Sequence, residues 1–514
     1  MITSVLLSCA VIVFLYYYVI HLARFRRLIN LIPGPRMFPI IGDLETMSLK
    51  SCEGLMEQVV TRFKNHNCLY KIWLFTIAYI TISHPDDMQT LLNSTRNNEK
   101  GMAYTLLHSW LGDGLLLSKG AKWQERRKIL TPAFHFHILK RFFDILIEES
   151  NHMEKSLQDI KGSTVENLMS FVSQHTLNII SETSMGISLR NIDAREQQQY
   201  RQAVHEIGEL LFYRMLRPWY YSDMTFPMSS RYKDQVKCLK VLHEFTEKVI
   251  KERKQYHEST NGRFLNFEKA EEDEEIIGGG KKRLAMLDLL IAASKDTNLS
   301  DLDIREEVDT FMFEGHDTVA MALTFAILLL AEHKDAQDRV RDEVNAVMEE
   351  NGGKLNMAAL QNLTYLERCL KETMRLYPSV FCIFRKLTED VMMQSYLVPA
   401  GTQVYVDIFS LHKNPEFWPN PEVFYPDRFL PELVQDRHPF AYVPFSAGSR
   451  NCIGQRFAMM EMKVVLATLV RNFYLEPMQR LADVRLAGNV ILRPSERLRM
   501  KFVPVQGAHA AKVA

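Results

Sequence analysis

The chain has 514 residues, enough by length for one large core or for two or three domains. Its 62 Lys and Arg residues balance its 62 Asp and Glu residues, so the formal net charge is zero and no global field favours nucleic acid. The seven cysteines are scattered, odd in number and without a C-x-x-C pair, which argues against a disulfide framework or a zinc site and for a reducing compartment.

The N-terminus predicts a membrane anchor. The stretch from Ile2 to Ala23 contains no Asp, Glu, Lys or Arg, and about 20 apolar residues span a bilayer core. Positive charges follow it, so the rest of the chain is expected in the cytosol; they are Arg24, Arg26 and Arg27. A buried core helix is the alternative. We therefore expect a transmembrane helix in residues 1–28 and one globular domain in residues 29–514.

The remaining pattern is mainly helical with small β-sheets, an α+β class. Pro33 and Pro35 end the anchor helix. The β-branched and aromatic run Leu69–Ile82 predicts a hairpin. From Asp87 to about Ile250 the pattern is helical, and short strands are expected between Phe384 and Asp407.

Two segments stand apart from this pattern. The polar, acidic and Gly-rich stretch Gln255–Lys282 predicts a mobile surface loop, after which helices resume. Phe212–Met228 gathers aromatics and methionines around two prolines. It is either a core loop or a second membrane contact with aromatics at the interface.

A cationic stretch begins at Trp123. Trp123 and Arg127 are four residues apart and share one helix face. An indole N–H and a guanidinium suit a carboxylate, although ordinary amphipathic packing gives the same spacing. Further cations form a basic patch that suits an acidic electron donor or a merely solvated face; they are Lys119, Lys122, Arg126 and Lys128.

The run Glu307–Thr318 (EVDTFMFEGHDT) places three functional groups at i, i+3 and i+4 of one expected helix face: Glu314, Asp317 and Thr318. Gly315 lies among them, and glycine inside a helix usually marks close packing or a site. An acid beside an alcohol can relay protons to bound oxygen. A solvated acidic face with the threonine bonded to its own helix is the alternative.

A third constellation is structural. Glu372 and Arg375 are three residues apart on an expected helix and can form an ion pair. The proline-rich run Asn420–Phe429 fixes an extended path that presents Arg428. The alternative is an ion pair on the protein surface, which would contribute little to stability.

The most specific motif is Phe445–Gly454 (FSAGSRNCIG), which puts one cysteine before an expected helix, Gln455–Asn472. The positive end of that helix and Arg450 favour a Cys452 thiolate. Gly454 lets the backbone approach something flat and bulky. A buried free cysteine is the common alternative, but a thiolate beside a cation and a flat void suits haem iron.

This motif resembles the haem-binding loop of the cytochromes P-450, and other motifs of that superfamily follow in the expected order after the anchor. The resemblance implies the cytochrome P-450 fold with haem b (iron protoporphyrin IX) as cofactor. Cys452 would be the axial metal ligand, with Phe445 and Gly454 framing the haem. The propionates would be held by Trp123, Arg127, Arg385 and Arg450.

The resemblance also implies roles on the expected oxygen-activating helix and below the haem. Asp317 and Thr318 would be the catalytic acid–alcohol pair, and Glu372, Arg375 and Arg428 a structural triad. The full Glu307–Thr318 run more narrowly resembles family 4, the fatty-acid ω-hydroxylase branch, in which the glutamate at Glu314's position often forms an ester with the haem. Val319 departs from that branch, which commonly has Thr or Ser there.

The expected function is therefore a haem-thiolate monooxygenase acting on a lipophilic substrate, with fatty-acid or lipid ω-hydroxylation implied by family 4. By resemblance, NADPH acts indirectly through NADPH-cytochrome P-450 reductase, with cytochrome b5 as an optional second donor. The expected location is the endoplasmic reticulum membrane, single-pass and microsomal. A haem-thiolate isomerase or dehydratase, and a non-catalytic membrane haem-binding protein, are the alternatives.

Overall fold

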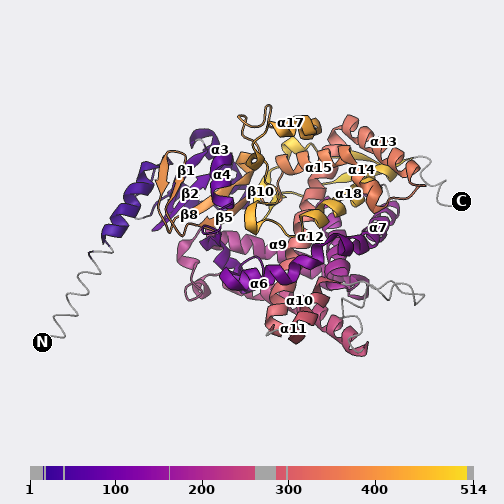
Figure 1. Cartoon of the computed structure of the whole chain (residues 1–514), viewed down its shortest axis with the longest axis horizontal. Coiled ribbons are helices and arrows are strands. Elements are labelled where there is room, and N and C mark those ends of the chain that lie inside the picture. The colour runs from indigo at the N-terminus through magenta and orange to yellow at the C-terminus, as the bar shows by residue number, and fades with distance from the viewer. Residues whose placement is uncertain are drawn as a thin grey trace.

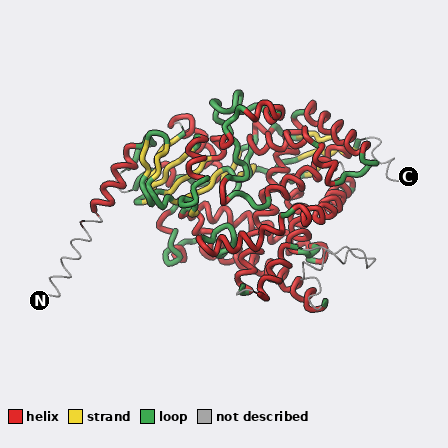
Figure 2. The backbone as a smooth tube through the Cα atoms, viewed as in Figure 1, coloured by secondary structure: helices red, strands yellow, loops and turns green. Residues whose placement is uncertain are grey.

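A computed structural model describes residue 16 and the ranges 19–38, 41–66, 68–160, 163–260, 285–296 and 299–505. In Figures 1 and 2 the strands β1 (Leu69–Leu74), β2 (Ile77–Ile82), β5 (Cys382–Lys386) and β8 (Gln403–Asp407) lie beside the N-terminal helix, and the remaining body is mostly helical with a few further short strands. The α-helices are α2 (Leu44–Met47), α3 (Cys52–His66), α4 (Pro85–Leu92), α5 (His108–Leu111), α6 (Gly120–Leu130), α7 (Phe136–Gln158), α8 (Leu168–Ile180), α9 (Ala194–Met215), α10 (Tyr232–Ser259), α11 (Met286–Asp296), α12 (Asp301–Glu332), α13 (Lys334–Glu350), α14 (Met357–Asn362), α15 (Thr364–Leu376), α16 (Ile408–Leu411), α17 (Pro431–Gln435) and α18 (Gln455–Asn472).

The largest described sheet has the strand order β1-β2-β8-β5-β3 and is built from segments far apart in the chain. Strands β2 and β8 are parallel, and the other neighbours are antiparallel. Its strands are β1 (Leu69–Leu74), β2 (Ile77–Ile82), β3 (Glu99–Lys100), β5 (Cys382–Lys386) and β8 (Gln403–Asp407).

Three smaller sheets complete the described strands, in the orders β4-β12-β9, β10-β11 and β6-β7. Their strands are β4 (Thr164–Val165), β6 (Val391–Met393), β7 (Tyr396–Val398), β9 (Phe473–Pro477), β10 (Leu486–Gly488), β11 (Leu492–Pro494) and β12 (Met500–Pro504). The expected hairpin and short strands are thus confirmed, and α18 has the predicted bounds.

Helix α12 is the central helix of the body (Figure 1). The Ser300 hydroxyl caps its first turn, and the Asp303 carboxylate accepts a hydrogen bond from the Ser300 N–H in return. Among the described residues it is the one helix long and apolar enough to cross a membrane, but 83% of its apolar window is buried inside the protein. It is therefore a core helix.

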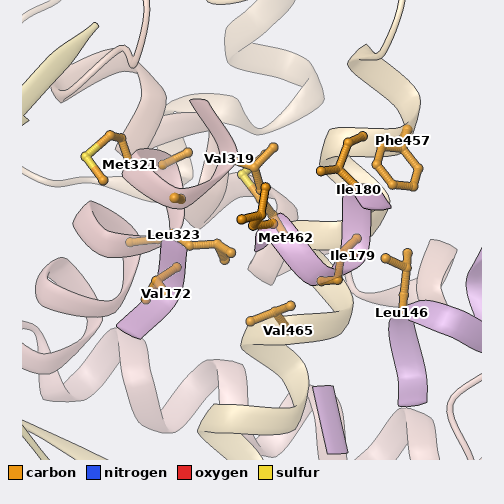
Figure 3. Close-up of a cluster of buried hydrophobic side chains, with 14 of the residues drawn as sticks. Leu146, Val172, Ile179, Ile180, Val319, Met321, Leu323, Phe457, Met462 and Val465 are labelled. Atoms are coloured by element: carbon orange, nitrogen blue, oxygen red, sulfur yellow. The ribbon is translucent and has the colours of Figure 1, made fainter. Parts of the chain in front are cut away.

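The core continues from α12 into the neighbouring helices. Figure 3 shows side chains from neighbouring helices meeting in one cluster, among them Leu146 of α7, Ile180 of α8, Val319 of α12 and Met462 of α18. At Gly315 an added Cβ would lie 2.4 Å from Ile180 Cδ1, so this glycine lets α8 and α12 approach closely.

The described part of the N-terminal region is helical over residues 19–31. Val19 and Ile20 are exposed, whereas Ile29 and Ile32 are fully buried in a core cluster with the β1–β2 hairpin. Most of the anchor expected at Ile2–Ala23 lies outside the described residues. The globular body thus begins to bury side chains at Ile29.

Two other sequence expectations have partial outcomes. Helix α10 continues to Ser259, so the first residues of the loop expected from Gln255 are helical, and residues 261–284, which hold the rest of that expected loop, lie outside the described part. In the Phe212–Met228 segment Phe226 is buried while Trp219 and Met228 are exposed, so the segment is partly core and the membrane contact stays a prediction.

Candidate functional site

A cavity of about 260 Å³ lies between α12, α6, β5 and the loop that precedes α18. Cys452 and Gly454 line it from that loop, and Glu314 and Thr318 line it from α12. Most of its wall is apolar. The sequence motifs found far apart in the chain therefore meet at one cavity.

The Cys452 loop is fixed by its backbone. The Cys452 N–H donates to the Phe445 carbonyl oxygen at 2.9 Å, closing the loop. Ser446 and Gly448 both adopt positive φ, at 58° and 70°. A Cβ on Gly448 would lie 1.9 Å from the Leu92 carbonyl oxygen, so this position requires glycine.

Among the free cysteines of the described chain, Cys452 has the largest solvent exposure, and its exposed surface faces the cavity. Burial, and then the Glu314 carboxylate, raise its pKa to about 11 against the opposing effects of the Gly454 N–H and Arg127. Desolvation of the thiolate therefore outweighs the positive groups near the sulfur. The role of Cys452 as the axial ligand stays a prediction.

Trp123 and Arg127 of α6 both line the cavity, as their spacing predicts. Arg127 donates to the Asn451 carbonyl oxygen at 3.0 Å and to its side-chain oxygen at 2.9 Å, which ties α6 to the cysteine loop. The Arg450 guanidinium lies 4.1 Å from the Trp123 ring centroid and donates to the Ser118 carbonyl oxygen at 2.9 Å.

The cations at this edge of the cavity lack an anion. Nε and Nη1 of Arg450 are buried without a hydrogen-bond partner in the described structure. Burial, then Arg385 and Arg127, lower the Arg450 pKa to about 10. Arg385 is buried beside this edge without lining the cavity itself. Unpaired buried donors of one sign are a fitting cradle for a bound carboxylate.

Lys100 is a further cation that sequence reasoning missed. It lies on the short strand β3, lines the cavity and is 4.6 Å from the Tyr104 ring centroid. Burial and the neighbouring Arg385 and Arg450 lower its pKa well below the usual value. Its local sequence, NNEKG, is polar and carries no signal for a buried site.

Glu314 and Thr318 lie one turn apart on the cavity wall. Burial raises the Glu314 pKa to about 7, and Lys100 opposes that rise. The Thr318 hydroxyl donates to the Glu314 carbonyl oxygen at 2.7 Å, which is the helix-bonded state weighed against function. Thr318 nevertheless lines the cavity, so its hydroxyl stays a candidate for the catalytic role.

Asp317 does not share that surface. It is buried, does not line the cavity, and accepts a hydrogen bond from Arg493 Nη2 in a buried ion pair. Consecutive helix residues differ by about 100°, so the neighbour of Thr318 points toward β11 instead. The expectation of one shared face for Asp317 and Thr318 is corrected here. Arg493 was not singled out from the sequence.

The expected triad is assembled. Glu372 accepts from Arg375 Nε at 2.7 Å, from Arg375 Nη2 at 2.8 Å and from Arg428 Nε at 3.2 Å. Arg375 also donates to the carbonyl oxygens of His412 and Pro421. All three charged side chains are buried, so this is a core network and not a surface pair.

The expected basic patch on α6 is only partly available. Arg126 is buried and pairs with Asp303, and Lys122 lies 3.3 Å from a Glu306 carboxylate oxygen. These two cations therefore join α6 to α12, while Lys119 and Lys128 stay exposed.

Comparison with known proteins agrees with this site. The sequence model of the family "Cytochrome P450" matches residues 32–502. Cytochrome P450 4c3 of Drosophila melanogaster is 41% identical over 98% of this chain and 94% of that protein. Human cytochrome P450 4V2 is 38% identical over 91% and 88%. The crystal structure of a cytochrome P450DA heme domain aligns with a TM-score of 0.75 at 23% identity, covering 92% of this chain and 98% of that one.

The chain therefore belongs to the cytochrome P450 family and has its fold and its monooxygenase class. The family implies a haem with a thiolate-ligated iron, and family members generally draw electrons from a redox partner. The cavity fits such a group, since it combines the Cys452 thiol, a mostly apolar wall and buried guanidinium donors without partners among the described residues.

Proposed function

We propose that this protein hydroxylates fatty acids or similar long-chain lipids at or near the terminal carbon. The reaction consumes O₂ and NADPH with one proton, and yields the alcohol, water and NADP⁺. The observation that carries the proposal is Glu314, a half-buried carboxyl that lines the same cavity as Cys452 and belongs to the family 4 run Glu307–Thr318. Relatives named as family 4 members at 37–41% identity support it.

In this proposal Cys452 holds the iron through its thiolate. The haem would supply oxygen activation, which an axial thiolate favours. Arg127, Arg450, Trp123 and Lys100 hold the propionates, with Arg385 adding positive charge behind them. Phe445 and Gly454 frame the cysteine. The ion-pair network of Glu372, Arg375 and Arg428 would support the Cys452 loop.

Thr318 and Asp317 manage protons in different places. The Thr318 hydroxyl is at the cavity, where it could leave the Glu314 carbonyl oxygen and donate a hydrogen bond into the cavity. Asp317 is buried and pairs with Arg493, which lines a polar cleft together with His205 and Glu209. We infer that protons from that cleft reach Asp317 beside Arg493 and pass from there toward Thr318.

Glu314 is proposed to become esterified to a methyl group at the haem periphery: a new C–O bond would replace one methyl C–H bond, a two-electron oxidation for which the O₂ and NADPH of turnover would supply the oxidant and two waters would leave. Its carboxyl lies one turn before Thr318 on the cavity wall and has a pKa near neutrality, so a carboxylate is available for bond formation. A covalent link would stiffen the cavity and favour attack on a terminal methyl group.

The anchor, location and partners are proposed on the same basis. Residues 1–28 would anchor the chain in the endoplasmic reticulum membrane, with residues 29–514 in the cytosol. The exposed side chains of Trp219, Met224 and Met228 support a second lipid contact. Lys119 and Lys128 remain exposed for an acidic surface of NADPH-cytochrome P-450 reductase or of cytochrome b5.

The test is turnover of long-chain fatty acids by the purified protein with reductase. We expect NADPH- and O₂-dependent formation of the ω-hydroxy acid, identified by mass spectrometry. Rearrangement of a lipid hydroperoxide without NADPH would instead support the isomerase or dehydratase alternative. Haem binding without either reaction would support a non-catalytic protein.

A further inference from the structure

A second, smaller cavity lies away from Cys452, between α3, the β1–β2 hairpin and the end of α9. Its volume is about 70 Å³. Its wall is mostly apolar, with contributions from Leu55, Val59 and Leu216. Several polar side chains nevertheless reach this cavity: Thr46, Gln58, Arg62, Tyr70, Tyr79, Thr81, Tyr221 and Tyr405.

The most unusual of these groups is Arg62, which is only 4% exposed. Its Nη2 lies 2.6 Å from an Asp43 carboxylate oxygen and 3.1 Å from a Glu45 oxygen. Its Nε and Nη1 are buried and have no hydrogen-bond partner among the described residues. A buried guanidinium N–H without an acceptor loses the hydrogen bonds that water gave it, so an acceptor is missing from this cavity.

The Gln58 side chain also has a donor without an acceptor at this cavity. One end of the Gln58 side-chain amide bonds the Thr46 hydroxyl at 3.0 Å, while the other end is buried without a partner in the described structure. The Asp43 carboxylate already accepts from the Thr46 hydroxyl at 2.7 Å and from Arg62. Asp43 neutralises Arg62, and the exposed Glu45 carboxylate adds one negative charge, so an incoming oxygen would be held by the unpartnered Arg62 N–H groups and not by net positive charge.

The two cavities are separated by one layer of aromatic rings. Tyr104 lines the Cys452 cavity, whereas Phe384 and Tyr405 line the smaller one. The ring centroid of Phe384 lies 6.3 Å from that of Tyr104 and 5.2 Å from that of Tyr405. The Phe384 ring therefore lies between a ring of each cavity, and a chain that passes from one cavity to the other requires this side chain to rotate.

We propose that the smaller cavity binds the carboxyl head group of the long-chain acid whose far end is oxidised beside Cys452. The head group accepts hydrogen bonds from Arg62 and meets the Gln58 amide, and the hydrocarbon passes Phe384. This inference rests on the proposed fatty-acid substrate. It makes Arg62 a substrate-binding residue that holds the head group away from the reacting carbon, which selects the distal end for oxidation.

The test compares two ligands of equal chain length on the haem-loaded protein. The dissociation constants of hexadecanoic acid and hexadecane are measured by spectral titration for the wild type, Arg62→Met and Gln58→Leu. We expect Arg62→Met to weaken the acid about tenfold, equivalent to about 1.4 kcal/mol, and to leave hexadecane unchanged. The same variant should shift part of the hydroxylation of the acid to internal carbons. Arg96→Gln, on an exposed ion pair with Glu389, is the matched control.

Several outcomes overturn the inference. An unchanged affinity for the acid in Arg62→Met would mean that the cavity holds ordered water only, and an equal loss for both ligands would mean a structural role. If Arg62→Met does not fold, Gln58→Leu, which breaks no ion pair, must weaken the acid selectively. Wild-type protein that binds hexadecane but not the acid would refute only the head-group site. A wild type that oxidises neither refutes the proposed substrate class.

Discussion

Replacing Glu372 by glutamine should destabilise the folded protein while leaving the shape of the side chain intact. Glu372 is fully buried and accepts four hydrogen bonds, from Arg375 Nε, Arg375 Nη2, Arg428 Nε and the Tyr425 N–H, at 2.7 to 3.2 Å. A glutamine keeps one acceptor oxygen and turns an N–H₂ group toward donors. Two buried guanidinium groups would then face no negative charge.

Removing one partner of a buried ion pair typically costs about 3–5 kcal/mol. An unfolding entropy of about 2.1 cal/mol/K per residue gives roughly 1 kcal/mol/K for 514 residues, so the melting temperature should fall by about 3–5 °C. Differential scanning calorimetry on the wild type and Glu372→Gln measures this. The control is Arg96→Gln, whose exposed ion pair should contribute little. A Glu372→Gln melting temperature equal to that of the control would refute the buried-network reasoning.

Four further predictions concern the cavity helix and the cysteine loop. Cys452→Ala should abolish the red-shifted Soret band of the reduced carbon-monoxide complex, and survival of that band would remove Cys452 as the ligand. Thr318→Ala should let most NADPH be consumed without product and raise peroxide, whereas Thr318→Ser should keep coupling. Acid extraction and mass spectrometry should find haem retained on turned-over wild type but released from Glu314→Ala. Burial raises the Asp309 pKa from 3.8 to about 8, so the folded chain binds this proton more tightly than the unfolded chain. The stability of the folded protein should therefore fall as pH rises between these two values. Melting temperatures measured from pH 4 to 8.5 should fall less steeply in Asp309→Asn than in the wild type.

Local sequence predicted the elements that depend on local chemistry. The bounds of α18 follow from an uninterrupted apolar pattern after Gly454, and the β1–β2 hairpin follows from β-branched and aromatic residues. The triad was found through motif resemblance, because spacing alone joins Glu372 to Arg375 but not to Arg428. Its burial was not predictable from the amphipathic pattern.

The remaining errors come from long-range contacts. Asp317 and Thr318 are neighbours in sequence, yet the partner that orients Asp317 is Arg493, 176 residues away. Lys100 and Arg62 lie in polar or amphipathic stretches that resemble solvated surface, and only the packing of β3 beside β5 and of α3 beside Asp43 buries them. The sequence also did not show how strongly burial opposes a Cys452 thiolate, because ten residues do not reveal the packing around the sulfur.

The charges around the Cys452 cavity connect folding with cofactor binding. Arg127, Arg385, Arg450 and Lys100 repel one another, and burial together with this repulsion lowers the pKa values of Lys100 and Arg450. The thiol of Cys452, in turn, stays protonated in an apolar wall. A group that brings a cation to the sulfur and carboxylates to the guanidinium groups relieves both costs at once. Binding that favours the folded state stabilises it by mass action, so haem binding should raise the melting temperature of the folded chain.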